Sequence, residues 1–93
     1  MLYLISYDIS DDKQRRQAAV VLEGCGQRVQ ASVFESDLSE REYKAVREQL
    51  RKRVVLGERD SIRFYRLCGN CRERIEIIGN GLDPAHSPDI FIV

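Results

Sequence analysis

The sequence predicts an α+β fold, a ferredoxin-like plait of order βαββαβ in a single domain over residues 1–93. Three observations predict it: strand and helix patterns alternate along the chain, one ten-residue strand pattern is long enough to fold as two strands, and the length suits one domain. So small a chain has a thin core, with helices on one face of its sheet. The other face needs a partner to cover it, so we expect a homodimer.

The first predicted strand covers residues 2–9, and the first predicted helix covers residues 11–24. The strand is almost continuously apolar, which is typical of a central strand covered on both faces. The helix carries an apolar stripe at helical spacing, and Gly24 and Gly26 end it. The stripe consists of Ala18, Val21, Leu22 and Cys25.

Residues 27–36 alternate between two faces, with Phe34 opposite Val33. Ten residues exceed a usual strand length, so we expect a kink or bulge near Ala31 and Ser32. If this segment counts as two strands, the element order becomes that of the plait.

A second helix is predicted over residues 40–55, because Ser39 and Glu42 form a capping box. Its apolar stripe consists of Tyr43, Val46, Leu50 and Val54. Residues 60–67 form the next predicted strand. The CGNC segment is then expected to be a turn, and residues 72–79 a returning hairpin strand.

Residues 80–93 are predicted to form a loop and a short strand, IFIV. Four apolar residues after a polar loop need a partner. A free edge strand of the sheet offers one, and we expect that edge to belong to the partner subunit.

Composition limits the function classes. Fifteen basic residues balance fifteen acidic ones, which argues against a strongly basic nucleic-acid domain. Twelve of the fifteen basic residues, however, are arginine, which binds phosphate in a bidentate manner. The N-terminus does not resemble a signal peptide, and no apolar run approaches the ~20 residues of a membrane span. We therefore expect a cytoplasmic protein without membrane contact.

Asp8 is the sharpest candidate for a functional residue. It ends a buried-looking strand, where functional residues gather in mixed α/β folds. It is either a metal ligand or general base, or a cap for the following helix. Asp11 and Asp12 fit the cap role better, since they lie in the first turn of that helix. One carboxylate is a poor Mg²⁺ site, but a two-fold axis near Asp8 supplies a second copy.

Other candidates have structural alternatives. Arg15, Arg16 and Arg28 form either a phosphate-binding set or part of a solvated surface. Phe34 either stacks on a base or belongs to the core or the dimer interface.

The remaining motif, a pair of cysteines, is only weak evidence for a function. Cys68 and Cys71 form a CxxC motif, but Cys25 and His86 are too distant in sequence to complete a zinc site. A thioredoxin-type motif opens a helix, whereas this one is predicted to lie in a hairpin turn. We therefore interpret the pair as structural or incidental. Whether the two thiols are free, bridged or metal-bound is left open.

Four segments together resemble the small CRISPR-associated adaptation protein, the "Cas two" family of proposed endoribonucleases. They are YLISYDISDDKQRR, GQRVQASVFES, DSIRFYRLCGNC and RIEIIG, over residues 1–79 in the family's order. The resemblance implies a ferredoxin-like homodimer whose C-terminal segment adds a strand to the neighbouring subunit.

The resemblance also implies a site. Tyr7 and Asp8 fall on the family's YD pair and are the implied catalytic residues, with Asp8 and its symmetry mate as the implied Mg²⁺ site. Arg15, Arg28 and Phe34 fall on positions linked to activity, whereas Gln17 departs from an Arg found in some members.

The implied function is metal-dependent cleavage of single-stranded RNA, and in some members of double-stranded DNA, during spacer acquisition in antiviral defence. The alternative is a non-catalytic dimeric scaffold that bridges integrase subunits and binds duplex DNA. A third hypothesis, outside the resemblance, is a small-molecule regulatory plait without affinity for nucleic acid.

Overall fold

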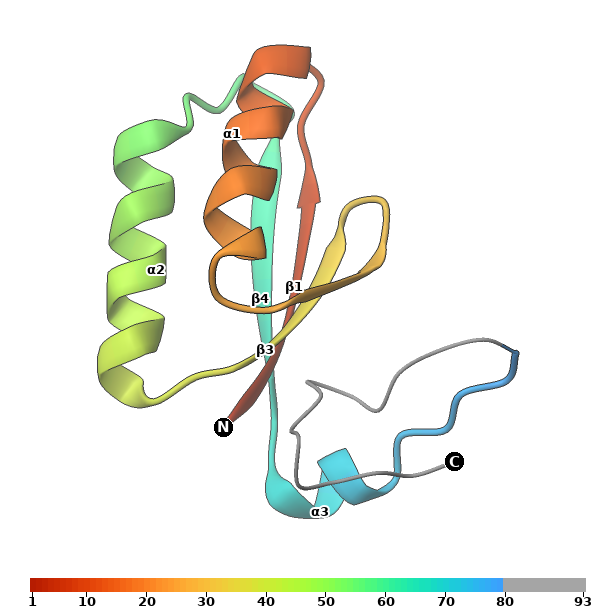
Figure 1. Cartoon of the computed structure of the whole chain (residues 1–93). Coiled ribbons are helices and arrows are strands. Elements are labelled where there is room, and N and C mark those ends of the chain that lie inside the picture. The colour runs from red at the N-terminus through yellow and green to blue at the C-terminus, as the bar shows by residue number, and fades with distance from the viewer. Residues whose placement is uncertain (80–93) are drawn as a thin grey trace.

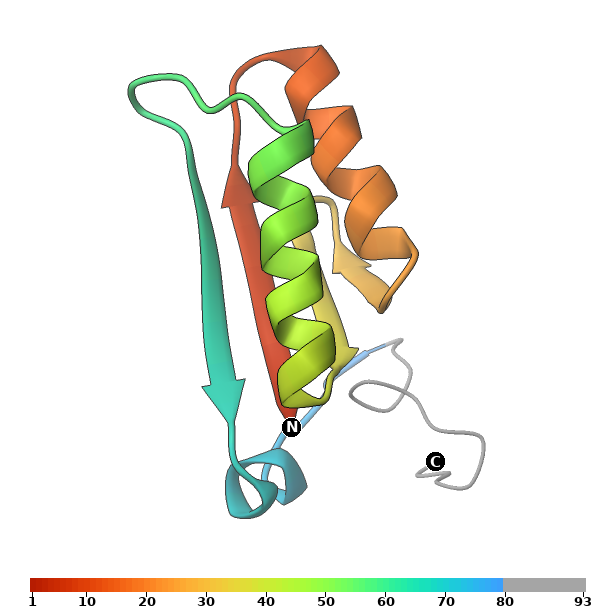
Figure 2. The same ribbon diagram turned by 90° about the vertical axis from the view of Figure 1, so that its left-hand side faces the viewer.

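A computed structural model describes residues 1–79, which form one antiparallel sheet with its two long helices on the same face (Figures 1 and 2). The elements are β1 (Leu2–Asp8), α1 (Asp12–Glu23), β2 (Gln27–Gln30), β3 (Val33–Asp37), α2 (Glu40–Arg53), β4 (Ser61–Leu67) and α3 (Gly69–Glu73). The strand order is β2-β3-β1-β4, with every pair antiparallel. The predicted ferredoxin-like plait is confirmed. The predicted C-terminal strand lies outside the described residues.

β1 is central, as predicted, but its two faces differ. Tyr3, Ile5 and Tyr7 are buried beneath the helices, whereas Leu4 and Ser6 are half-buried. Both long helices pack on one face (Figure 2), because right-handed crossovers place α1 and α2 on the same side. The expectation of cover on both faces is therefore wrong for the single chain. We call the uncovered side the open face.

Both long helices begin where the sequence places them. Asp11 is the N-cap of α1 and accepts a hydrogen bond from the Gln14 amide at 3.0 Å, which satisfies one of the helix's unpaired donors. Ser39 and Glu42 form the predicted capping box of α2. The Ser39 hydroxyl accepts from the Glu42 amide at 3.1 Å, and the Glu42 carboxylate accepts from the Ser39 amide at 2.8 Å.

The predicted break near Ala31 and Ser32 is a turn that separates β2 from β3. The register also shifts between Arg28 and Gln30, as in a β-bulge. A side chain at Gly26 would meet the Ser36 hydroxyl at 2.0 Å and the Glu35 carbonyl at 2.4 Å. Gly26 therefore permits the close approach that lets the chain leave α1 and pair with β3.

The predicted hairpin after β4 is wrong. The CGNC segment begins the short helix α3, and residues 74–79 form no strand. The Arg72 guanidinium donates to Asp37 at 2.7 Å, and Asp37 also accepts from the N-terminal amine at 3.1 Å. These contacts hold the chain at the end of β3, beside the start of β1, rather than back along β4. Ile78 consequently remains 99% exposed.

The core lies between the sheet and the two long helices. Both predicted helical stripes contribute to it, and Tyr3 stacks on Tyr43 of α2 with ring centroids 4.5 Å apart. Phe64 of β4 meets the Tyr43 ring edge-on at 5.5 Å, an arrangement that aromatic pairs favour. Among residues 1–79, no helix has the length and apolar character required to cross a bilayer.

Candidate nucleic-acid and metal site

Asp8 is the last residue of β1 and is exposed. Side chains alternate along a strand, so Asp8 points to the open face while Tyr7 points toward the helices. Within residues 1–79 the Asp8 carboxylate makes no hydrogen bond or ion pair. Arg63 shares the open face, and its pKa is raised, mainly by its hydrogen bond to the Tyr65 hydroxyl and in smaller part by the Asp8 charge.

The Asp8 carboxylate suits a hard divalent cation, because its oxygens are exposed and uncommitted. It provides only part of such a site. No group of three or more His, Cys, Asp or Glu side chains among the described residues is placed to hold a metal ion. Asp8 therefore supplies one suitable Mg²⁺ ligand, and the described residues of a single chain do not add the further carboxylates of a complete site.

Asp60 is a neighbouring acid that was not among the residues predicted from the sequence. It joins the two loops at this end of the sheet, accepting from the Ser10 amide and hydroxyl at 3.1 Å each and from the Gly57 amide at 2.8 Å. The Gly57 amide, followed by the Ser10 amide, lowers the pKa of Asp60. Asp60 is thus committed to positioning the backbone just beyond Asp8. Its only signal in the sequence is an Asp placed shortly after Gly57.

Four of the predicted site residues line one hollow of about 370 Å³ between α1 and the β2–β3 hairpin. We call it the arginine hollow. It is lined by Tyr7, Arg15, Arg16, Ala19, Arg28, Ala31 and Ser32. The structure brings the three arginines of the candidate set to one surface, and their role in phosphate binding stays a prediction. Guanidinium groups around a concave surface of this kind suit phosphate groups.

The three arginines differ in how they are held. Arg15 donates to the Ile9 carbonyl at 3.1 Å and forms an ion pair with Asp12. Arg28 forms an ion pair with Glu23 at 2.7 Å. Arg16 is exposed and makes no hydrogen bond or ion pair within residues 1–79. Its charge is therefore the least compensated of the three.

Tyr7 and Phe34 support this hollow from within the core. Tyr7 is 6% exposed, and its hydroxyl donates to the Ala31 carbonyl at 3.3 Å, which fixes the turn between β2 and β3. Phe34 is 0% exposed, with its ring centroid 6.3 Å from that of Tyr7. The Arg28 guanidinium carbon lies 5.1 Å from the centroid of the Phe34 ring.

The base-stacking prediction for Phe34 is therefore wrong, and its alternative, a core residue, is correct. Phe34 pairs with Ile5 across the sheet, and directly opposite residues point to the same face. Ile5 faces the core, so Phe34 does too. Its ring serves as a platform for Arg28 and is not available to a base.

The sheet separates the two parts of the candidate site. Tyr7 and the three arginines lie on the helix side, whereas Asp8 lies on the open face. One chain thus presents a phosphate-binding surface and an uncommitted carboxylate in different directions. Any ligand that contacts both must pass around the end of β1.

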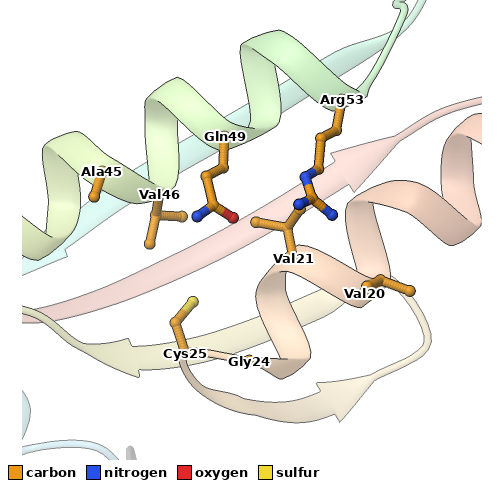
Figure 3. A pocket seen from close by; sticks show the side chains of 8 residues that line it. All are labelled: Val20, Val21, Gly24, Cys25, Ala45, Val46, Gln49 and Arg53. Carbon is orange, nitrogen blue, oxygen red and sulfur yellow. The ribbon is translucent and has the colours of Figure 1, made fainter.

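A second hollow, of about 230 Å³, lies between α1 and α2 and contains none of the predicted site residues (Figure 3). Val20 and Val21 line one side, and Val46 and Arg53 line the other. Cys25 lies at one end, where burial raises the pKa of its thiol. This hollow is mostly apolar and offers no set of groups for phosphate.

Comparisons with known proteins agree with this geometry. The family model described as CRISPR associated protein Cas2 matches residues 1–75. A Chloroflexus aurantiacus protein named CRISPR-associated endoribonuclease Cas2 1 is 53% identical over 93 residues, covering all of both chains. A hypothetical protein from Thermus thermophilus has a similar crystal structure, with TM-score 0.75 and 40% identity over 89% of this chain and 95% of that one.

A further structural relative is a chain in a partial Cas6-RT-Cas1–Cas2 complex. It has TM-score 0.63 and 33% identity over 83% of this chain and 89% of that one. The match to the family model, the identity with the Chloroflexus protein and the shared fold lead to one conclusion: the chain belongs to the Cas2 family of CRISPR-associated proteins.

Proposed function

We propose that the chain is a homodimeric, Mg²⁺-dependent endonuclease of CRISPR spacer acquisition, acting on single-stranded RNA and also on double-stranded DNA. The observation that carries this proposal is the Asp8 carboxylate, exposed and uncommitted at the end of the central strand. The name of the Chloroflexus relative, an endoribonuclease, supports the reaction class.

The open face supports pairing with a second copy. Tyr65 is 47% exposed there, and Leu4 and Val33 are half-buried within one chain. Two-fold pairing of these faces places the same residues opposite one another. Two Asp8 carboxylates brought together repel, and a divalent cation between them relieves that repulsion. The two Asp8 carboxylates would hold Mg²⁺, which would supply Lewis-acid polarisation of a phosphodiester and a lowered pKa of bound water.

The other predicted residues bind and position the substrate. Arg15, Arg16 and Arg28 contact phosphates of the substrate strand where it passes around the end of β1. Tyr7 is a positioning residue, since its hydroxyl is already engaged by the Ala31 carbonyl and holds the wall of the arginine hollow.

The test compares Asp8→Asn with the wild type in Mg²⁺-dependent cleavage of single-stranded RNA and double-stranded DNA. Glu58→Gln is the matched control, because Glu58 is also an exposed acid without a hydrogen bond or ion pair within residues 1–79. We expect cleavage of both substrates to be lost in Asp8→Asn and retained in the control. Equal rates in all three proteins, after removal of contaminating nuclease, refute the catalytic role.

A second candidate function is a duplex-binding scaffold between integrase subunits. The observation that favours it is the separation of the arginine hollow from Asp8 by the sheet. The partial Cas6-RT-Cas1–Cas2 complex shows that a similar chain assembles with such a partner, and we propose a Cas1-type integrase as the partner here. Substrate binding then depends on phosphate contacts and falls steeply with salt.

Spacer integration distinguishes the two functions. If the chain acts as a scaffold, spacer integration is retained in Asp8→Asn. It is lost when Arg16 and Arg28 are both changed to Gln. Duplex binding by that double variant also depends less steeply on salt, because two phosphate contacts are removed. Loss of integration in Asp8→Asn, with dimerisation and duplex binding intact, instead favours the catalytic role.

A further inference from the structure

The two cysteines of the CxxC motif lie at the start of α3, Cys68 just before its first residue and Cys71 within it, and both are exposed. Cys68 is the N-cap residue of the helix, and Cys71 is its third helical residue. The Arg72 amide donates to the Cys68 carbonyl at 2.8 Å, which closes this turn. Residues three apart on a helical turn are neighbours on its surface, so the two thiols face solvent side by side.

This arrangement removes the reason for treating the motif as incidental. That interpretation depended on the motif lying in a hairpin turn, whereas the structure places it at the start of a helix, as in dithiol redox motifs. Cys25 takes no part, because it is half-buried in the hollow between α1 and α2. The pair is therefore the accessible dithiol of the described chain.

The two thiols also differ chemically. The Cys68 side chain makes no hydrogen bond that caps α3, but the neighbouring Cys71 amide and thiol lower the pKa of Cys68. The same contact raises the pKa of Cys71. Cys68 is thus the thiol that more readily forms the nucleophilic thiolate, and Cys71 is the one that keeps its proton.

We propose that Cys68 and Cys71 form a thiol–disulfide exchange site that reacts with small-molecule disulfides of the glutathione class. The Cys68 thiolate attacks one sulfur of glutathione disulfide, which forms a mixed disulfide and releases one glutathione thiolate. Cys71 then loses its proton and attacks the Cys68 sulfur, which releases the second glutathione. The two protein thiols are oxidised to one disulfide, and glutathione disulfide is reduced to two glutathione molecules.

The local structure permits this closure. A disulfide requires β-carbons roughly 3.5–4.5 Å apart, somewhat closer than the ~5–6 Å usual for residues three apart on a helix. The first turn of α3 must therefore tighten. Little opposes that movement, because none of the five residues of α3 is buried.

Closure also acts on a tertiary contact. Arg72 follows Cys71 directly, and its guanidinium holds the chain to Asp37 at 2.7 Å. Tightening the turn between Cys68 and Cys71 moves Arg72, the residue that anchors α3 to Asp37 at the end of β3. The site therefore links the oxidation state of the dithiol to the path of the chain beyond β4.

The test incubates the reduced full chain with glutathione disulfide, then unfolds it and alkylates the remaining thiols for mass spectrometry. We expect the number of alkylated cysteines to fall from three to one, with only Cys25 labelled and two hydrogen atoms lost per chain. In Cys71→Ser we expect a stable glutathione adduct on Cys68. In Cys68→Ser we expect little adduct, and Cys25→Ser should form the disulfide like the wild type.

Three results overturn the proposal. One is a wild-type chain in which all three cysteines are still alkylated after treatment with glutathione disulfide, under conditions that fully oxidise a model dithiol. Another is a disulfide between chains, detected as a covalent dimer without reductant. The third is a Cys71→Ser variant that carries its adduct on Cys25. Circular dichroism of each variant confirms the fold, which exposed Cys→Ser changes are expected to preserve.

Discussion

Changing Phe34 to Leu tests whether this ring supports the arginine hollow from the core or contacts the substrate directly. Phe34 is fully buried, packs against the Tyr7 ring and carries the Arg28 guanidinium above its own ring. A ring in this position contributes to the free energy of unfolding, whereas a ring that stacked on a base at the surface would contribute mainly to substrate affinity.

The expected loss follows from these contacts. An aromatic pair contributes about 0.5–1.5 kcal/mol beyond its buried area. A cation–π contact near the surface contributes about 0.5–1 kcal/mol. The smaller side chain also leaves space in a closed core, which costs about 1 kcal/mol. We expect Phe34→Leu to lower the free energy of unfolding by about 2–3 kcal/mol, equivalent to roughly 10–20 °C in Tm for a chain of this size.

Urea denaturation followed by circular dichroism measures this change. Val29→Ala is the matched control, since Val29 lies on the neighbouring strand and is 43% exposed, and its effect should stay within about 0.5 kcal/mol. In the Arg28→Gln background, the cost of Phe34→Leu should be smaller, because the cation–π contact is already absent. Unchanged stability of Phe34→Leu together with weaker RNA binding would refute our placement of this ring.

Two further predictions concern stability. Ser39→Ala removes the capping hydrogen bond to the Glu42 amide and should lower the free energy of unfolding by about 1 kcal/mol in urea denaturation. Ser39→Asp should keep most of that stability. An alanine variant as stable as the wild type would contradict the capping box. The Arg72 guanidinium, followed by the N-terminal amine, lowers the pKa of Asp37 below its ordinary 3.8. Asp37 should therefore stabilise the fold fully above that ordinary value and lose its contribution as the pH falls through the lowered one. Urea midpoints measured against pH should decline less in this acidic range for Asp37→Asn than for wild type, and identical pH dependence would count against the Asp37–Arg72 contact.

Patterns local in sequence predicted most of the fold. The apolar stripe of α1 and the Ser39–Glu42 box of α2 depend on residues three or four apart, so the sequence displays them directly. The break between β2 and β3 was predictable because a strand of ten residues is unusually long. Arg15, Arg16 and Arg28 could be grouped as one candidate set, although their common hollow is visible only in the structure.

Long-range contacts explain what the sequence could not reveal. The RERIEIIG segment alternates like a strand, yet the Asp37–Arg72 contact, between residues 35 apart, directs the chain elsewhere. The burial of Phe34 depends on its pairing with Ile5 across the sheet, and neither face of an alternating segment is identifiable as the core from its own residues. The role of Asp60 is likewise set by Ser10, fifty residues away.

We propose that two chains share one Mg²⁺ site through their Asp8 carboxylates. Titration with Mn²⁺, which prefers the same oxygen ligands, followed by electron paramagnetic resonance, measures this stoichiometry directly. We expect one tightly bound ion for every two chains in the wild type and in Glu58→Gln, and none in Asp8→Asn. One ion per chain, or undiminished binding in Asp8→Asn while the dimer persists, would contradict it.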